Sequence, residues 1–265
     1  MIDLGTYLRN VDWDGHVHLF NSSQSLFELY NPKSSKLIGF ADIEFDHIND
    51  FDGKMIDIYD NYIKNHYNNN QILLATAPGS KEAIAIYEKF PNIIKGFGEL
   101  KLYNKYRDKE IPYKKISIAR DIAGYSSKNN NLPVYIHYSL TNTREANNLN
   151  NLLKSYPTVP IVLCHCGMES GFEDCAFYYV VDLMKKYSNL WVDISYIALD
   201  YFISNYMKLY NLDLDRIILG SDINIKMFGK AHKDPCGDCE LIMRNLRILY
   251  NIVNSDNNIK KLFQL

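Results

Sequence analysis

The sequence has no long uncharged apolar run, no excess of one charge and no even set of cysteines. The formal net charge is -2 over 265 residues, so the chain lacks the basic footprint of proteins that bind nucleic acid through bulk electrostatics. No stretch approaches the roughly 18 apolar residues of a membrane span. Met1–Val11 shows no basic region followed by an apolar run, so no signal peptide is predicted. Five cysteines in a chain of this length favour reduced thiols over a disulfide framework, and hence a cytoplasmic protein.

Apolar runs of strand length recur along the chain, and helix-like amphipathic segments separate most of them. The strand-like runs are Trp13–Phe20, Ile72–Ala77, Ile93–Leu100, Leu132–Ser139, Val159–Cys166, Leu190–Ser195 and Arg216–Asp222. The helix-like segments are Met55–Tyr67, Lys81–Phe90, Tyr113–Ser126, Thr143–Tyr156, Asp174–Tyr187, Ala198–Tyr210 and Cys239–Asn251. This alternation predicts βα units around a parallel sheet.

The sheet is predicted to close into a (β/α)8-type TIM barrel, an α/β fold that takes up residues 1–265 as a single domain. Seven strands are clear, and the eighth either lies in Lys36–Phe40 or is missing. A doubly wound open sheet is the competing layout, but it carries a glycine-rich phosphate loop after its first strand. The chain has His16-Val17-His18-Leu19-Phe20 at that point, so the barrel is favoured. The less regular stretch Asn21–Asn70 is expected to pass over the barrel mouth.

Ionisable side chains gather late in the predicted strands, at the end of a barrel where chemistry is usually found. Six such residues lie in five different strands: His16, His18, Glu99, His137, His165 and Asp222. Each is part of an otherwise apolar run, where an uncompensated charge is costly to bury. A divalent cation would compensate these charges, because imidazole nitrogen and carboxylate oxygen are ligands for zinc, manganese or iron.

Each of these residues also has a purely structural explanation when taken alone. The pair His16 and His18 can pack or make hydrogen bonds, and an isolated His137 or His165 is more often a satisfied core histidine. Asp222 can cap a helix. The joint placement of all of them at one rim favours a metal site over these separate explanations.

The order of these motifs along nearly the whole chain resembles that of the amidohydrolase superfamily. The motifs that carry the resemblance are Asp14-Gly15-His16-Val17-His18-Leu19, Gly98-Glu99-Leu100, Pro133-Val134-Tyr135-Ile136-His137, Cys164-His165-Cys166-Gly167, Asn189-Leu190-Trp191-Val192-Asp193-Ile194-Ser195, Leu219-Gly220-Ser221-Asp222 and Asn258-Ile259-Lys260-Lys261-Leu262-Phe263. They are most similar to the branch called amidohydrolase-2 and to related TatD-like proteins. The resemblance implies a metal-dependent TIM-barrel hydrolase.

The resemblance also implies roles for the metal-binding residues. His16 and His18 resemble the first-strand metal ligands of the family. Glu99 resembles the bridging glutamate of TatD-type members. His137 and His165 resemble the histidines of the middle strands, which bind a second metal or orient the substrate.

Asp222 resembles the last-strand aspartate that binds metal and accepts a proton from the attacking water. Asp222 and His165 are therefore the expected catalytic residues, the first as proton acceptor and donor and the second as a polarising group. Two ions fit if Glu99 bridges them, and one ion suffices if it does not. Zinc is the expected ion, with manganese and iron as alternatives.

Two departures from the family pattern bear on the site. No lysine stands at the Glu99 position, so a carboxylated-lysine bridge is not expected, although Lys101 lies just beyond on the same strand face. The loop Ile223–Lys226 lacks the aromatic-proline pair that is frequent in this branch. The second departure concerns the substrate pocket more than the metal site.

Residues around the strand ends are weaker candidates. Lys101, Tyr103, Tyr138 and Ser195 flank strand ends and could meet an anionic group of a substrate, although a packed or solvated position is the commoner case. Asp193 is expected on the inward face of its strand, where it can brace a metal ligand.

The cysteines give two further expectations. Cys236 and Cys239, preceded by His232, offer half of a zinc knuckle or a redox pair. No second Cys-x-x-Cys completes such a site, so a loop that leads into a helix is favoured. Cys164 and Cys166 flank the histidine motif, and strand alternation predicts that both pack against helices.

Cleavage of a carboxamide, lactone or ester-like bond of a small molecule by a metal-activated water is the expected function. The alternatives are a TatD-like phosphodiesterase or nuclease, a metal-dependent decarboxylase, and a non-catalytic barrel that keeps its metal. Asp222 argues against the last, because such a barrel needs no proton acceptor. The expected partner is a small-molecule substrate, neither a membrane nor nucleic acid, and homo-oligomer formation stays open.

Overall fold

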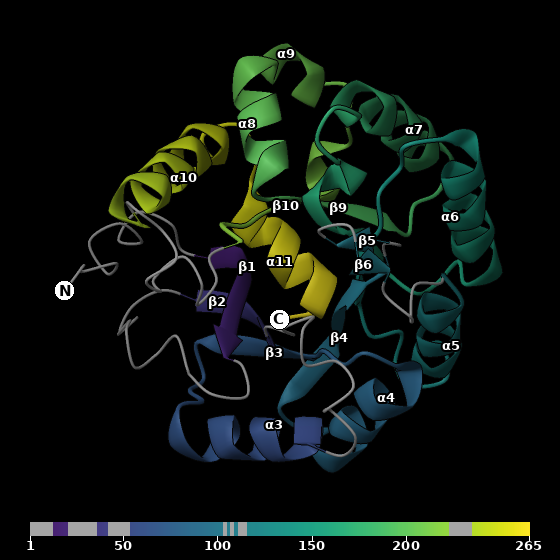
Figure 1. Ribbon diagram of the computed structural model, residues 1–265, viewed down its shortest axis with the longest axis vertical. Coiled ribbons are helices and arrows are strands. Elements are labelled where there is room, and N and C mark those ends of the chain that lie inside the picture. Colours follow the sequence, from purple (N-terminus) through teal and green to yellow (C-terminus); the bar gives the residue numbers. More distant parts are fainter. Residues whose placement is uncertain are drawn as a thin grey trace.

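A nearly closed barrel of eight parallel strands forms the centre of the protein (Figure 1). The computed structural model describes residues 13–20, 36–41, 54–102, 105–106, 109–110, 116–222 and 235–265. The strands are β1 Trp13–Phe20, β2 Lys36–Ala41, β3 Gln71–Ala75, β4 Ile94–Lys101, β7 Val134–His137, β8 Ile161–Leu163, β9 Leu190–Ile194 and β10 Ile217–Leu219. Each pairs in parallel with the next in this order. The predicted (β/α)8 barrel is therefore confirmed.

The eighth strand is β2, which lies in the stretch that was expected either to hold it or to leave it missing. Its residues from Leu37 to Ala41 are buried, because this strand faces the barrel interior on one side and the helices on the other. The barrel thus has eight strands rather than the seven that stand out in the sequence. Most of the predicted excursion over the mouth, residues 21–35 and 42–53, lies outside the described residues.

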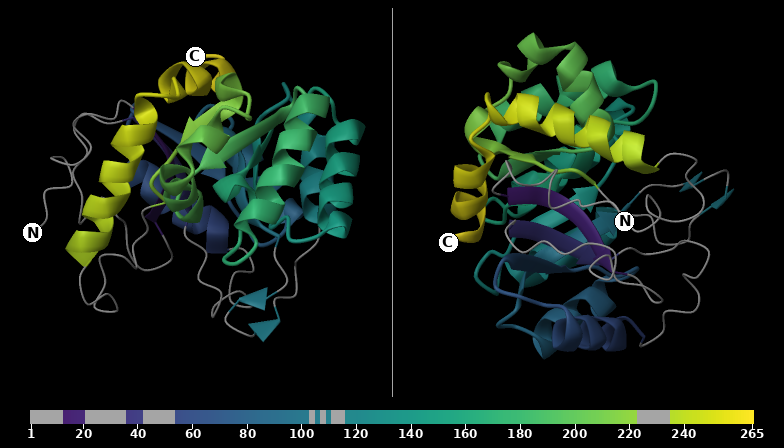
Figure 2. Two further views of the ribbon diagram at one scale, coloured as in Figure 1. Left: turned by 90° about the horizontal axis from the view of Figure 1, so that it is seen from above. Right: turned by 90° about the vertical axis from the view of Figure 1, so that its left-hand side faces the viewer.

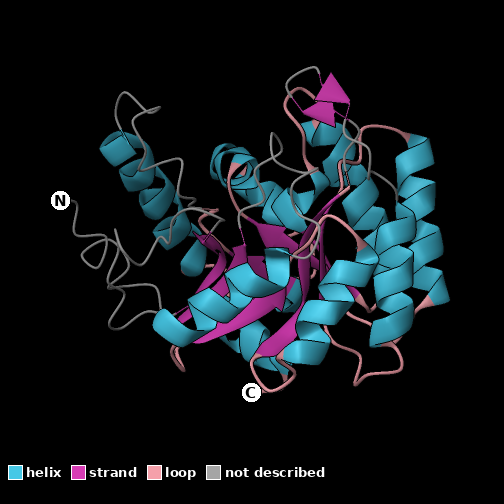
Figure 3. Ribbon diagram, turned by 60° about the horizontal axis from the view of Figure 1, so that its bottom comes forward, coloured by secondary structure: helices cyan, strands magenta, loops and turns pink. Residues whose placement is uncertain are grey.

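Helices surround the strands on the outside of the barrel (Figure 3). They are α3 Lys54–Asn65, α4 Ser80–Lys89, α5 Ile116–Ser126, α6 Thr143–Ser155, α7 Glu173–Lys186, α8 Ile197–Ser204, α9 Tyr206–Leu209, α10 Pro235–Tyr250 and α11 Ser255–Phe263, with short 3-10 turns η2 Cys164–Gly167 and η3 Leu214–Arg216. The predicted helix Ala198–Tyr210 is divided at Asn205 into α8 and α9. None of the described helices has the length and apolar character that crossing a membrane requires.

Helix α6 shows how the local sequence sets an element of the outer layer. The Asn142 side chain accepts hydrogen bonds from the backbone N–H groups of Arg144 and Glu145 at 3.0 and 3.2 Å, so two N–H groups of the first turn are satisfied. The apolar residues Ala146, Leu149, Leu152 and Leu153 recur at three- and four-residue steps and are all buried. This stripe packs the helix on the barrel.

Two glycines allow the first and last strands to approach each other and close the barrel. A Cβ on Gly15 would lie 2.7 Å from the Leu219 carbonyl oxygen, and a Cβ on Gly220 would lie 2.6 Å from the His16 backbone nitrogen. Only a residue without a side chain fits such a gap. The contact brings the Asp222 N–H to the His16 carbonyl oxygen at 2.8 Å, which ties the end of the chain's last strand to the first.

The two ends of the barrel differ in what covers them. Helix α11 lies across one end, and the two-stranded sheet of β5 Lys105–Tyr106 and β6 Lys109–Glu110 lies at the other, after the carboxyl end of β4 (Figure 2). Inside the barrel, Trp13 and Ile218 pack with Ile259 and Leu262 of α11 in one apolar cluster. The ionisable side chains singled out in the sequence lie towards the opposite end.

Candidate metal centre

His16 and His18 point into the barrel from β1 and present their Nε2 atoms to the same space. These two nitrogens are 3.4 Å apart, and both side chains are buried. The two residues share one strand face because side chains alternate along a strand. The geometry thus places the His-x-His pair where the sequence predicted it.

Asp222 completes a three-atom face with this pair. Its Oδ1 lies 3.4 Å from the His16 Nε2 and 3.1 Å from the His18 Nε2. Ligand atoms about 2.1 Å from a tetrahedral ion lie about 3.4 Å from one another, so the three distances fit one divalent ion without rearrangement. Asp222 follows β10 with a left-handed φ of 57°, and its N–H is fixed by the His16 carbonyl oxygen described above.

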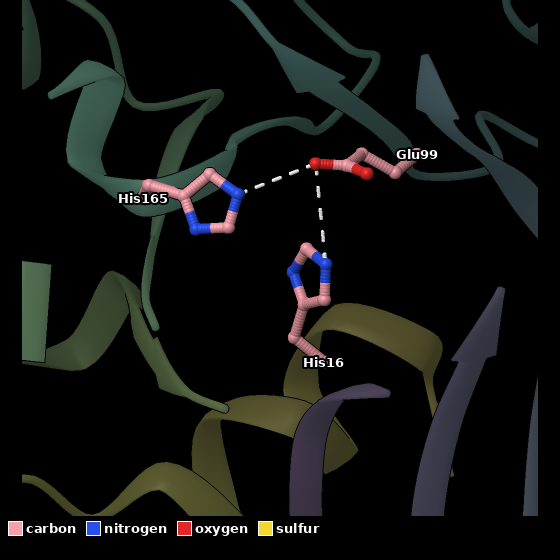
Figure 4. Close-up of side chains that lie close together, drawn as sticks. All are labelled: His16, Glu99 and His165. Carbon is pink, nitrogen blue, oxygen red and sulfur yellow. Dashed lines mark ion pairs between the residues drawn. The ribbon is translucent and has the colours of Figure 1, made fainter. Parts of the chain in front are cut away.

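Glu99 joins this face to the two remaining histidines, and Figure 4 shows its contacts with His16 and His165. Its Oε1 lies 2.7 Å from the His137 Nδ1 and 3.3 Å from the His165 Nε2. Its Oε2 lies 3.5 Å from the His18 Nε2, and it makes no hydrogen bond with the described residues although it is buried. Lys101 Nζ lies 3.8 Å from this oxygen, beyond hydrogen-bond distance. A buried carboxylate oxygen without a donor is costly, and a metal ion bound to it would remove that cost.

The electrostatics of the pocket match this need for positive charge. Burial acts to raise the pKa of Asp222, but His165, His18 and His16 hold it below the ordinary value. Glu99 is likewise buried, and the neighbouring His137 is the largest of the influences that hold its pKa well below the usual range. Both carboxylates are therefore ionised, and a bound cation would offset their negative charge.

A carboxylate and a hydroxyl hold two of the candidate ligands from behind. Asp193 Oδ2 hydrogen-bonds the His16 Nδ1, and Ser195 Oγ lies 2.9 Å from the His165 Nδ1. Burial acts to lower the pKa of His16, yet Asp193 and the other nearby carboxylates raise it to about 10. Each contact directs the Nε2 of its histidine into the site, so the expected bracing role of Asp193 agrees with the geometry. Ser195, for which substrate contact was considered and a packed position was the commoner case, orients a histidine.

Phe40 is a site residue that sequence reasoning missed. Its ring lies 4.5 Å from the His16 ring and 5.8 Å from the His18 ring, centre to centre, and thus limits how both imidazoles can turn. The signal that could have revealed it is the eighth strand, because Phe40 is the late, inward-facing residue of β2 at the level of the His pair.

His165 reaches the site from a turn and not from a regular strand. Strand β8 ends at Leu163, and His165 and Cys166 in η2 take left-handed φ values of 52° and 55°. This break of alternation corrects the prediction for the flanking cysteines. Cys166 packs in the cluster between barrel and helices, but Cys164 lies in the cluster inside the barrel, near His16.

The weaker candidates fall into three groups. Lys101 Nζ lies 3.8 Å from Glu99 Oε2 with a side chain that is 12% exposed, so it borders the site. Tyr138 is buried and accepts a hydrogen bond from Asn148, which fits the packed alternative. Cys236 and Cys239 lie in the first turns of α10.

Some predicted positions cannot be placed. Tyr103, Ile223–Lys226 and His232 lie outside the described residues.

Comparisons with known proteins agree with the fold and the motifs. Residues 127–239 match the family model named Amidohydrolase. An amidohydrolase from Burkholderia multivorans with bound zinc has 10% identity and a TM-score of 0.57, over 96% of this chain and 99% of that one. A putative 2-pyrone-4,6-dicarboxylic acid hydrolase from Pseudomonas putida has 13% identity and a TM-score of 0.54, over 95% and 97%. A TatD family hydrolase from Entamoeba histolytica has 14% identity and a TM-score of 0.53, over 94% and 98%. No curated protein sequence matches the chain.

The barrel and its cluster of histidines and carboxylates define an enzyme of the metal-dependent TIM-barrel class. The family match confirms the resemblance of this chain to the amidohydrolase superfamily. A general metal-dependent hydrolytic function follows, and the cluster of histidines and carboxylates is a candidate site for a divalent ion.

Proposed function

We propose that the protein hydrolyses a carboxamide, lactone or ester-like bond of a small molecule, with His16, His18 and Asp222 holding one divalent ion. The observation that carries the proposal is the face formed by these three residues, whose ligand atoms are 3.1 to 3.4 Å apart. Asp222 is 14% exposed while His16 is fully buried, so the carboxylate is the member of the face that reaches towards the mouth.

We further propose a second ion on His137 and His165, with Glu99 as the bridge. The support is the position of the carboxylate, with Oε2 towards His18 and Oε1 towards the other two histidines. Zinc is the ion of choice, because the donor set is imidazole and carboxylate and the Burkholderia relative binds zinc. Manganese and iron take the same donors.

Asp222, His165 and Lys101 have different roles in the proposed hydrolysis. An ion held by these residues would supply a water of lowered pKa and would polarise the bond to be cleaved. Asp222 would accept a proton from the attacking water and return it to the leaving group. His165 lies with its Nε2 4.0 Å from Asp222 Oδ2, and its Nδ1 is held by Ser195. In a site with one ion this Nε2 is placed to polarise the substrate carbonyl, and in a site with two ions it serves as a ligand instead. Lys101 at the edge of the site favours a substrate with an anionic group.

A TatD-like phosphodiesterase is the second candidate, because Glu99 lies between two groups of histidines. Two ions about 4 Å apart suit the cleavage of a phosphodiester. A decarboxylase of the same branch would use the same ligands without hydrolysis. A small-molecule substrate, a homo-oligomer, a cytoplasmic location and a single domain stay predictions.

One set of assays separates these functions. The purified protein is stripped with a chelator, reloaded with zinc, manganese or iron, and given p-nitrophenyl esters, lactones, bis(p-nitrophenyl) phosphate and single-stranded DNA. We expect turnover of an ester or lactone that chelation abolishes and metal restores, with a metal count of two per chain. Turnover of phosphodiesters alone would establish the second candidate, and full activity of the metal-free protein would refute the metal mechanism.

A further inference from the structure

Residues with a side chain rarely adopt a positive φ, and the described residues that do so fall into two groups. Asn130, Asn131 and Gln264 lie in a turn and at the end of a helix. The other group lies around the metal centre: His165, Cys166, Tyr196 and Asp222. His165 and Asp222 are candidate ligands, and Cys166 adjoins one of them. Tyr196 is the member of this group for which the metal centre gives no reason.

The backbone of Tyr196 is strained, although its carbonyl oxygen accepts a hydrogen bond from the Leu199 N–H at 3.0 Å. Its φ of 48° and ψ of -118° belong to a region that glycine occupies freely and that is costly for any residue with a Cβ. The residue precedes α8, and its side chain makes no cap hydrogen bond. Its side chain is 55% exposed, so burial of the ring contributes little. Glycine would adopt this backbone conformation at a lower energy, so we infer that the tyrosine side chain has a function of its own.

The strained conformation brings the ring to the metal centre. Tyr196 directly follows Ser195, whose hydroxyl holds the His165 ring. The Tyr196 ring centre lies 6.3 Å from the His165 ring centre, with the two planes at 73°. The other nitrogen of that histidine faces Glu99 and the interior of the site. An aromatic ring that is more than half exposed therefore lies next to the ring of a candidate site histidine.

We propose that Tyr196 is a specificity-determining residue whose ring packs against a planar ring of the substrate. This inference rests on the proposed hydrolytic function, and it adds a substrate class: compounds that carry an aromatic or other flat ring next to the bond to be cleaved. Offset or edge-to-face packing of two rings favours such compounds over aliphatic ones of equal reactivity.

A pair of lactones tests this preference. Dihydrocoumarin and δ-valerolactone share the six-membered lactone ring, and only the first has a fused benzene ring. In Tyr196→Ala we expect the ratio of their kcat/KM values to fall about 3- to 10-fold from wild type, because the packing energy of the second ring is lost. Tyr196→Phe should keep the wild-type ratio. The matched control is Tyr206→Ala, because Tyr206 on α9 is 53% exposed and should leave the ratio unchanged. An unchanged ratio in Tyr196→Ala would overturn the proposal.

A binding measurement separates this proposal from the proposed hydrolytic function. Benzohydroxamate and acetohydroxamate carry the same metal-chelating group and differ in the ring, so their Kd values for the zinc-loaded protein can be compared by calorimetry. We expect Tyr196→Ala to reduce the preference for benzohydroxamate about 3- to 10-fold. If wild type cleaves neither lactone but Tyr196→Ala reduces the preference for benzohydroxamate, the lactone activity is refuted and the role of Tyr196 is supported. Binding of neither hydroxamate would overturn both proposals.

Thermal unfolding gives a third, independent readout. Tyr196→Gly should raise the Tm of the metal-free protein by about 2–5 °C, because relief of backbone strain exceeds the added freedom of glycine in the unfolded chain. The same variant should show the lost ring preference. A fall in Tm together with an unchanged hydroxamate preference would identify Tyr196 as a purely structural residue.

Discussion

The two ends of the barrel are built from the same strands but on opposite principles. At the amino end, Trp13 of β1 and Ile218 of β10 pack against Ile259 and Leu262 of α11, and the Asn258 amide donates to the carbonyl oxygens of Leu214 and Ile217. At this end, apolar surface is removed from water and the Asn258 NH2 group is paired, although its Oδ1 has no hydrogen-bond partner among the described residues. The motif Asn258–Phe263, which lies in α11, thus covers the amino end of the barrel.

At the carboxyl end, burial and charge are opposed. Glu99, Asp193 and the His16 ring are almost fully buried, and oxygens of both carboxylates lack a hydrogen-bond donor among the described residues. Left-handed backbone conformations also gather there. One end therefore contributes stability, and the other stores unfavourable energy that a metal ion and a substrate can relieve. Substitutions at the carboxyl end should lower the activity, and substitutions at the amino end should lower the stability alone.

The largest effect is expected for Asp222→Asn at the carboxyl end. Loss of the proton acceptor should lower kcat/KM about 10³-fold, or about 4 kcal/mol in the activation barrier. The Tm of the metal-free protein should fall as well, because the neighbouring histidines hold the Asp222 pKa below its ordinary value, so the ionised carboxylate stabilises the fold. Steady-state kinetics and thermal unfolding check both expectations. Asp215→Asn is the control, since that side chain is 77% exposed. Activity within a factor of three of wild type would show that Asp222 is not the proton acceptor.

The sequence predicts those features of the barrel and its site that arise from local patterns of residues, and it misses those that arise from contacts between distant residues. The barrel follows from the alternation of strand and helix patterns, and the six site residues converge because the strands are parallel. The strand pattern was weakest for β2, whose neighbouring sequence is irregular, and so the packing of Phe40 on the histidines was not foreseen. Strand alternation correctly placed His16 and His18 on one face, although the pairing of β1 with β2 shifts register between Asp14 and Val17.

Alternation fails where the backbone leaves the strand. Val159–Cys166 reads as one strand, but only Ile161–Leu163 forms it, and left-handed turns at His165 and Cys166 follow. These conformations arise from contacts between residues distant in the sequence, such as the bond from Ser195 to the His165 ring. No local pattern signals them. For the same reason Cys164 was assigned to the wrong face and Tyr196 was not singled out at all.

A smaller effect, on stability alone, is expected at the amino end. Leu262→Ala leaves a cavity beneath the barrel and should lower the free energy of unfolding by about 2–5 kcal/mol, a fall in Tm of about 5–15 °C. The kcat measured well below that Tm should stay unchanged, because the metal centre lies at the other end. Leu241→Ala is the control, since Leu241 is 44% exposed. A comparable loss of kcat in Leu262→Ala would break the separation of the two ends.

The smallest effect is expected for Asp193→Asn. Asp193 lies just beneath the metal centre, so this substitution tests whether the residue serves metal binding or the stability of the fold. The amide keeps the size of the side chain but removes the charge that holds the Nδ1 of His16. We expect the affinity for zinc to fall about 10- to 100-fold, equivalent to about 1.4–2.8 kcal/mol, as measured by competition with a chromophoric chelator. At saturating zinc, most of the activity should return, because Asp193 orients a ligand and touches no reacting atom. Asp182→Asn on the exposed side of α7 serves as the control. If the variant binds zinc as tightly as wild type but unfolds at a lower temperature, Asp193 contributes to the stability of the barrel and not to metal binding.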